Sequence, residues 1–307
     1  MPRVTIIILT YNESLHTLEC LASIEKLTYP NFEVLIVDNK SIDDSREKLG
    51  EYTNTHSNTR HLLLDKNYGF AGGNNRGITN AFKHGADYVL ILNPDTIIEP
   101  DFLTKLVEIA NGKLGFFGPR ILLWDEGKYR ANNLHARIYS NGGIINKTFT
   151  KATLKDYEKR VSALKEKKPF ETDYVTGTCL LASREAIEKV GLMREDYFLY
   201  YEDTDWSMRA KRNGIMRIII PHAIIWHKKS VTTKEFSYTY IYYNTRNGLY
   251  FCWRNGKAWQ KSFAIALALV KLVKQPIKLF FRQKRAWIKP ITRGIVDFLL
   301  GETGKLT

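Results

Sequence analysis

The stretch VTIIILTYN, residues 4–12, has the pattern of a buried strand that ends in three polar residues. Its first seven residues are mostly β-branched and carry no charge, which is typical of a strand covered on both faces. Stretches of helical spacing alternate with further apolar runs along the chain: 13–24, 33–37, 60–64, 72–84, 88–92 and 101–110. This alternation predicts βαβ units and therefore an α/β fold with a mainly parallel sheet flanked by helices.

The composition is that of an ordinary globular protein. Of the 307 residues, 44% are hydrophobic and 25% are charged, which excludes disordered and collagen-like chains. At about 150 residues per domain, the length fits two units, or one α/β domain with a C-terminal extension. Cys20, Cys179 and Cys252 lie far apart, so we expect neither a disulfide framework nor a cysteine-rich zinc site. A reducing cytosol is the simplest compartment.

Polar clusters follow four of the predicted strands, each at the carboxyl end. They are the segments 10–12, 38–41, 65–67 and 93–95. In open α/β sheets, ligands bind in the crevice outside the carboxyl ends of the strands. The four clusters therefore predict one binding site.

Two of these regions suggest contacts with a nucleotide. Asp38 is the first polar residue after its strand, where its carboxylate could accept a hydrogen bond from the ring N–H of uracil or thymine. The residues after it, Asn39 to Asp43, suit a turn and a helix cap equally well. The glycine-rich segment 67–75 opens a helix, so its backbone N–H groups could meet a phosphate. It matches neither the P-loop nor GxGxxG, and a tight turn is the alternative.

Carboxylates that could bind metal or move protons lie in two segments. Asp95, in Asn93-Pro94-Asp95, ends a buried strand, and oxygen ligands of this kind suit Mg²⁺ or Mn²⁺. His227 ends another strand and is a plausible partner, although a turn at Asp95 and a structural histidine are the alternatives. The segment 200–206 places three carboxylates beside aromatic residues. Glu202 or Asp205 would suit helix capping, and a carboxylate in such surroundings suits a general base.

The pattern is looser from 124 to 169. We expect an insertion or loop there, with a turn over 139–143 and an exposed, charged helix over 154–168. Regular structure resumes after it. The expected strands are 174–182, 217–220 and 223–226, and the expected helices are 184–190 and 203–212.

Taken together, these motifs resemble the family 2 inverting glycosyltransferases, in particular their rhamnosyltransferase-like branch. The resemblance rests on an ordered series of segments: 4–12, 37–43, 67–75, 93–96, 176–178, 198–209 and 226–227. It implies a GT-A fold, a Rossmann-like nucleotide-diphospho-sugar transferase architecture, with a catalytic domain over 1–250. The remaining residues, 251–307, would form a basic amphipathic helical tail.

The resemblance also implies roles for single residues. Asp203 would be the catalytic base, and Asp95 and His227 would bind Mg²⁺ or Mn²⁺. Asn93 stands where many relatives have the first aspartate of the metal-binding element. The residues implied to bind the nucleotide-sugar are Thr10, Tyr11, Asn12, Asp38, Asn67, Gly72, Gly73, Asn74, Asn93, Asp95 and Glu202. The expected reaction moves a sugar from a dTDP- or UDP-sugar to a glycan or lipid-linked glycan in cell-surface polysaccharide synthesis, and the resemblance favours rhamnose as that sugar.

The net charge of +14 is concentrated in the tail. Twelve Lys or Arg against Asp297 and Glu302 give +10 over 251–307, which leaves +4 for the first 250 residues. Apolar residues interleave with these charges from Trp253 to Leu300, with breaks expected at Pro276 and Pro290. This pattern fits interfacial helices on an anionic membrane, or aromatic residues that pack on the domain or a second copy.

No apolar run approaches the length of about 20 residues that a spanning helix needs. Residues 4–9 are too short for a signal-peptide core and lack a cleavage site. We therefore expect a cytoplasmic protein, peripheral on the cytoplasmic face of the membrane. A sugar nucleotidyltransferase would carry a glycine- and arginine-rich loop after the first strand, where this chain has Thr10 to Glu13. A nucleic-acid-binding module would not place acidic clusters at strand ends, where they repel phosphates.

Overall fold

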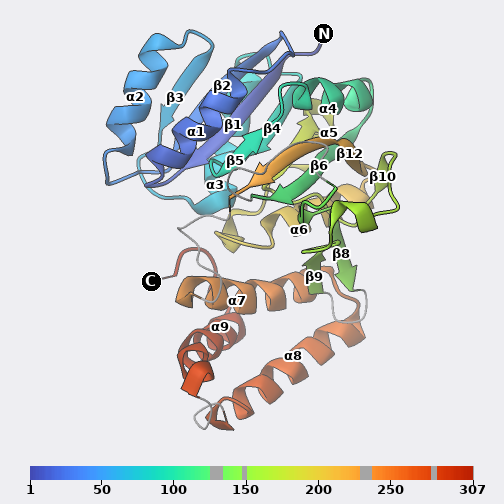
Figure 1. Ribbon diagram of the computed structural model, residues 1–307. Helices are drawn as coiled ribbons and strands as arrows, with labels where there is room; N and C mark the ends of the chain where they lie inside the picture. Colours follow the sequence, from blue (N-terminus) through green and yellow to red (C-terminus); the bar gives the residue numbers. More distant parts are fainter. Residues whose placement is uncertain (125–133, 147–150, 229–236, 278–281, 307) are drawn as a thin grey trace.

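A computed structural model of the chain describes residues 1–124, 134–146, 151–228, 237–277 and 282–306. Within this part, ten strands form one sheet whose main path runs β10-β12-β6-β11-β4-β1-β2-β3 (Figure 1). The strands on this path are β1 (Val4–Thr10), β2 (Phe32–Asp38), β3 (Thr59–Leu63), β4 (Tyr88–Leu92), β6 (Gly115–Leu123), β10 (Phe170–Glu171), β11 (Cys179–Ser183) and β12 (Met216–His227). β5 (Thr96–Ile98) pairs with β12, and β7 (Ile138–Ser140) pairs with β6.

Three of the four parallel pairs join strands that the apolar runs predict, whereas the fourth contains β6, whose residues are not among the predicted strands. β1 is parallel to both β2 and β4, β2 is parallel to β3, and β6 is parallel to β12. β11 is antiparallel to both of its neighbours, β4 and β6. The mainly parallel α/β sheet expected from the sequence is therefore confirmed.

Helices cover both faces of the sheet, which explains why β1 is apolar on both sides. Ile6 and Ile8 pack in one core with α1 (Ser14–Ile24), α2 (Ser45–Thr55) and α4 (Phe102–Ala110). Ile7 points the other way, into a core with α3 (Gly69–Lys83), α5 (Arg184–Val190) and α6 (Glu202–Arg212). Successive side chains of a strand alternate between its faces, so an unbroken apolar run fills two cores.

The prediction of a helix over residues 154–168 is wrong. The chain forms a hairpin of β8 (Gly143–Asn146) and β9 (Lys151–Leu154), then turns and one short 3-10 helix, η1 (Val161–Ala163). Asp156 and Glu158 have φ of +60° and +62°, which an α-helix excludes. The Asp156 carboxylate accepts hydrogen bonds from Asn141 (3.0 Å) and Lys159 (2.8 Å), so local pairing determines this segment. Residues 125–133 and 147–150 lie outside the described residues.

Three element boundaries also differ from expectation. The strands expected at 217–220 and 223–226 are one strand, β12, with a register shift between Ile220 and Ile224. α3 begins at Gly69 instead of residue 72. Of the strand expected over 174–182, only Cys179 onward is in the sheet, and residues 176–178 form a loop at the crevice.

The C-terminal part folds into helices that lie beside the sheet domain (Figure 1). They are α7 (Tyr238–Asn255), α8 (Ala258–Val273), η4 (Arg282–Trp287) and α9 (Ile288–Leu300). Pro290 does not break a helix, because it lies in the first turn of α9, where a missing N–H costs nothing. The division expected at residue 250 falls inside α7, and the two-part organisation stays a prediction. None of the described helices combines the length and apolarity needed to cross a membrane.

Some of the tail's aromatic residues do pack on the sheet domain. Phe251 of α7 and Phe298 of α9 share a core with Tyr197, which lies in the short helix η2 (Glu195–Tyr197) before α6. The three cysteines are free, in agreement with the disulfide-free fold expected from their spacing, and all three are buried.

Candidate functional site

Asp38 and Thr10 lie side by side at the carboxyl ends of β2 and β1, where they are paired in register. Both are fully buried. Asp38 Oδ1 accepts a hydrogen bond from the Ser41 N–H (2.7 Å), whereas Oδ2 receives none from any described residue. A buried acceptor without a donor is costly unless a ligand supplies one. The ring N–H of uracil or thymine would do so.

Asn12 joins the loops that follow β1 and β2. Its φ of +57° places it in the left-handed region, its N–H donates to Ser41 Oγ (3.0 Å), and its Oδ1 accepts from the Ile42 N–H (2.9 Å). Thr10 Oγ1 lies 3.0 Å from Thr17 Oγ1, so this hydroxyl already has a partner. Tyr11 is half-buried between them. These residues shape the crevice wall, and their contact with a nucleotide stays a prediction.

The glycine-rich segment forms the first turns of α3. Asn67 Oδ1 accepts the N–H of Gly69 (2.9 Å), the first residue of the helix. Gly72, Gly73 and Asn74 follow inside the helix. A Cβ on Gly73 would lie 2.3 Å from Leu9 Cδ1, so this glycine lets α3 approach β1 closely. Asn74 is buried, and its Oδ1 has no hydrogen-bond partner among the described residues. The role of these residues in nucleotide-sugar binding stays a prediction.

Asp95 and His227 form a buried carboxylate–imidazole pair. Asp95 follows β4, His227 ends β12, and Asp95 Oδ1 lies 3.1 Å from His227 Nε2. Nδ1 of His227 is buried and has no hydrogen-bond partner in the described part of the chain. Two ligands in adjacent positions of an octahedral Mg²⁺ site, each about 2.1 Å from the ion, are about 3 Å apart. The pair therefore fits a shared divalent cation.

No third His, Cys, Asp or Glu completes a metal cluster within the described ranges. Divalent cations at nucleotide sites are often held by one or two protein groups, with phosphate oxygens and water completing the shell. The tilted ring of Tyr139 covers His227, with 4.3 Å between ring centroids. Asn93 is half-buried, and its N–H donates to the Thr178 carbonyl (3.0 Å).

The loop 176–178 links this pair to Asp203. Its Thr178 carbonyl binds the Asn93 N–H, and its Gly177 N–H donates to Asp203 Oδ2 (2.8 Å). Three residues thus connect the Asp95 segment with the start of α6. The segments that carry Asp95 and Asp203, more than 100 positions apart in the sequence, are thereby joined through one loop.

Asp203 is held firmly in the first turn of α6. Its Oδ1 accepts hydrogen bonds from the N–H (2.6 Å) and the hydroxyl (3.1 Å) of Thr204. Burial raises the pKa of the Asp203 carboxyl, and the hydrogen bonds from Gly177 and Thr204 oppose that rise. The neighbouring Glu202 is buried more completely, and burial together with the Asp203 charge raises its pKa well above the ordinary value. A fixed carboxylate with a raised pKa can act as a general base.

The backbone just before Asp203 is strained. Phe198, Tyr200 and Tyr201 have φ of +64°, +68° and +73°, a region that non-glycine residues rarely adopt. The Phe198 carbonyl accepts the N–H of Phe70 at the start of α3 (2.7 Å). A Cβ on Gly69 would lie 2.3 Å from that carbonyl oxygen, and Gly69 itself has φ of +72°. Only glycine therefore allows α3 to approach the loop this closely.

The residue that braces this loop, Asn247 of α7, is one that sequence reasoning missed. Its Nδ2 lies 2.9, 2.7 and 3.0 Å from the carbonyl oxygens of Tyr197, Leu199 and Tyr200. Arg246 beside it donates to the Tyr197 carbonyl (3.2 Å), and both side chains are buried. The sequence feature that could have indicated this role is the position of Arg246 and Asn247, two polar residues on the buried face of α7 that also carries Tyr242, Tyr243 and Tyr250.

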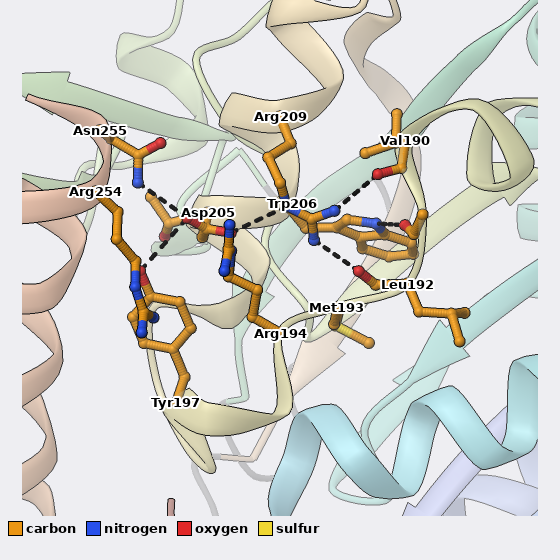
Figure 2. Close-up of polar contacts among 12 residues, drawn as sticks. Val190, Leu192, Met193, Arg194, Tyr197, Asp205, Trp206, Arg209, Arg254 and Asn255 are labelled. Atoms are coloured by element: carbon orange, nitrogen blue, oxygen red, sulfur yellow. Dashed lines mark hydrogen bonds and ion pairs between the residues drawn. The ribbon is translucent and has the colours of Figure 1, made fainter. Parts of the chain in front are cut away.

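Asp205, the third carboxylate, ties α6 to its surroundings. Figure 2 shows it between Arg209 and Asn255, whose Nε and Nδ2 lie 3.1 and 2.9 Å from its oxygens. Arg209 also donates to the carbonyls of Val190 and Leu192. Each oxygen of Asp205 thus has a partner within the protein, so this residue is structural.

We expect Asn247→Asp to destabilise the protein by about 2–3 kcal/mol or more, because it removes a buried donor and places a carboxylate against three carbonyl oxygens. Asn244→Asp is the matched control, since Asn244 is half-buried on the same helix and donates to one carbonyl, that of Tyr240 (2.9 Å). Urea unfolding followed by circular dichroism measures both variants. Equal unfolding midpoints for the two would show that Asn247 does not hold the loop.

Comparison with known proteins places this geometry in a family. The model of the family described as "Glycosyl transferase family 2" matches residues 5–191. The dTDP-rhamnosyl transferase RfbF of Shigella flexneri is 27% identical over 230 residues, which cover 72% of this chain and 67% of that protein. The N-acetylglucosaminyl-diphospho-decaprenol L-rhamnosyltransferase of Mycobacterium tuberculosis is 24% identical over 300 residues, with 91% and 95% covered.

Solved structures agree on the fold. The mannosyltransferase PcManGT from Pyrobaculum calidifontis, solved with GDP-Man and Mn²⁺, superposes with a TM-score of 0.59 at 18% identity. The match covers 98% of this chain and 88% of that one. The GT-A fold expected from the motifs is confirmed.

Proposed function

Because this chain belongs to glycosyltransferase family 2, an inverting family that uses nucleotide-sugars, we propose that it transfers rhamnose from dTDP-rhamnose to a lipid-linked glycan with the help of a divalent cation. The observation that carries the proposal is the link through Gly177 and Thr178, which joins the half-buried Asp203 to the Asp95 segment. The choice of donor and acceptor rests on the two rhamnosyltransferases named above.

In the proposed reaction, Asp203 accepts the proton of an acceptor hydroxyl as its oxygen attacks the anomeric carbon. The bond from that carbon to the nucleoside diphosphate breaks on the opposite side, so the configuration inverts. Asp38 holds the base through Oδ2. Asp95 and His227 would hold Mg²⁺ or Mn²⁺, which offsets the negative charge of the departing diphosphate. The strained loop and Asn247 keep the Asp203 carboxylate in place.

Contact with a membrane surface is the second part of the proposal. α8 exposes Trp259, Leu269 and Val273, with 55%, 49% and 77% of each residue accessible. The same helix and its ends carry Lys257, Lys261, Lys271 and Lys274 and no acidic residue. Apolar side chains flanked by lysines favour the interface of an anionic bilayer. A lipid-linked acceptor would be presented at that interface.

A donor panel tests the function. The purified protein is mixed with Mg²⁺ or Mn²⁺ and with UDP-, dTDP- and GDP-sugars, and thermal shift and nucleoside diphosphate release are recorded. We expect a metal-dependent response to dTDP-rhamnose that exceeds the response to the other sugars. A stronger response to another nucleotide-sugar would assign that sugar, instead of rhamnose, as the one transferred. A response to none of the donors would contradict the proposed function.

The raised pKa of Asp203 predicts how activity depends on pH. A general base must be ionised, so we expect kcat/KM to rise with pH through an apparent pKa above the ordinary aspartate value. The contribution of Asp203 to stability should change in the opposite direction, because a carboxyl whose pKa is higher in the folded state destabilises that state as it ionises. It is obtained as the difference in thermal unfolding between the wild type and Asp203→Asn. Rate profiles and thermal unfolding across the acidic range measure both. A rate that is already maximal at the ordinary aspartate pKa would contradict the assignment.

A further inference from the structure

A groove between α7, α8 and α9 is not used by the reaction described above. Its volume is about 510 Å³, within the range of about 300–1,000 Å³ typical of small-molecule sites. Phe263 and Leu267 of α8 and Ile291 of α9 provide apolar walls. Lys271 of α8 and Lys151 of the β8–β9 hairpin add basic groups.

The groove adjoins the loop that carries the base. Tyr201, two residues before Asp203, lines it, and the Tyr201 ring packs against Phe251 of α7 with 5.4 Å between centroids. Gly248 of α7 leaves room for this ring, since a Cβ there would lie 3.1 Å from the Tyr201 hydroxyl. A molecule in the groove therefore touches the same loop that positions Asp203.

The charge around the groove has one sign. α7 and α8 contain no Asp or Glu, and the charged residues that line the groove, Lys151 and Lys271, are both basic. Of the arginines of α7, Arg254 is paired with Asp196 outside the groove lining. The one carboxylate of α9, Asp297, is paired with Tyr242 and Arg293. Apolar walls in a positive field complement a molecule that joins a hydrocarbon chain to a phosphate group.

We propose that the groove binds the prenyl diphosphate part of the acceptor. This inference rests on the proposed function, and it assigns the acceptor subsite that the function leaves open. The prenyl chain lies against Phe263, Leu267 and Ile291, the diphosphate meets the lysines, and the attached sugar extends past Tyr201 toward Asp203. The exposed residues Trp259, Leu269 and Val273 do not line the groove, so the membrane-facing surface and the acceptor subsite are separate.

Two leucines of α8 allow a matched test. Leu267 lines the groove, and Leu269 points outward. The probe is farnesyl diphosphate, titrated by calorimetry into the full-length protein with Mn²⁺ and the nucleoside diphosphate of the best donor present to fill the donor site. We expect Leu267→Asp to weaken binding at least about tenfold and Leu269→Asp to leave it unchanged. Equal binding by both variants, or none by the wild type, would overturn the proposal.

A second pair of variants tests the lysines of the groove without placing a charge in its apolar wall. Lys271→Gln should weaken the binding of farnesyl diphosphate several-fold and leave the binding of farnesol unchanged. Lys274 lies outside the groove, so Lys274→Gln should change the binding of neither molecule. Nucleoside diphosphate binding is measured on the same samples. If it is intact while farnesyl diphosphate does not bind, the groove assignment fails and the proposed function stands.

Other occupants give different results. If Leu267→Asp lowers binding to dioleoylphosphatidylglycerol vesicles without weakening farnesyl diphosphate, the groove belongs to the membrane-facing surface. If Leu267→Asp converts a dimer into a monomer in sedimentation without weakening the binding of farnesyl diphosphate, a second copy of the chain fills the groove. Either result would overturn the proposal.

Discussion

Asp203→Asn is expected to lower the turnover of sugar transfer by about 10²–10⁴-fold, the usual contribution of a general base, with nucleotide-sugar affinity little changed. The physical reason is that an amide cannot accept the proton of the attacking hydroxyl. Asparagine has nearly the size of aspartate but offers one acceptor oxygen, whereas Gly177 and Thr204 donate to both carboxylate oxygens. Thermal unfolding is therefore recorded with the kinetics, so that turnover is measured on folded protein.

Glu202→Gln is the matched control for this variant. Glu202 is adjacent to Asp203 and buried, and the pKa of its carboxyl is also raised. Among the described contacts, no backbone N–H outside its own helix donates a hydrogen bond to the Glu202 carboxylate. Because Glu202 is also an implied contact of the nucleotide-sugar, the comparison is made at saturating donor, where we expect Glu202→Gln to retain most of the turnover. If Glu202→Gln loses transfer and Asp203→Asn keeps it, the base has been assigned to the wrong carboxylate.

Asp95→Ala is expected to weaken metal-dependent binding of the nucleoside diphosphate by about 100-fold or more, since loss of an outer-shell partner alone typically costs about 10–100-fold. The variant leaves His227 as the one protein ligand of the pair. Calorimetry with and without Mn²⁺ measures the effect, and EDTA should reduce wild-type affinity to that of the variant.

Asp101→Ala controls for the loss of one negative charge. Asp101 is exposed near the start of α4 and pairs with Lys105 (2.7 Å), so it is not part of the Asp95–His227 pair. It should keep the wild-type response to Mn²⁺. An Asp95→Ala protein that also kept this response would show that the cation, if one binds, is held elsewhere.

Much of the fold could be predicted from sequence because β1 and its neighbours are buried on both faces. Residues 4–10 and 88–92 form strands with the predicted bounds. The segment 154–168 could not be predicted from its charges, because lysines and glutamates occur in exposed helices and in paired turns alike. Its conformation depends on a hydrogen bond from Asn141, which lies outside the segment, 15 residues before Asp156.

The candidate site divides in the same way. Asp38, Asp95 and Asp203 each stand at the end of a strand or the start of a helix, so local pattern and position indicated them. Asn247 had no such signal. Its three acceptors lie 47 to 50 residues earlier in the chain, and only the packing of α7 against the loop before α6 brings them together.

The most direct measurement is a crystal structure with Mn²⁺ and the nucleoside diphosphate of the best donor, with the metal located by anomalous scattering. The account predicts one Mn²⁺ bound by both Asp95 and His227, the diphosphate on that ion, and the base against Asp38 Oδ2. The β-phosphate, which carries the sugar in the donor, should point toward Asp203. A nucleotide bound elsewhere, or a Mn²⁺ that touches neither Asp95 nor His227, would contradict it.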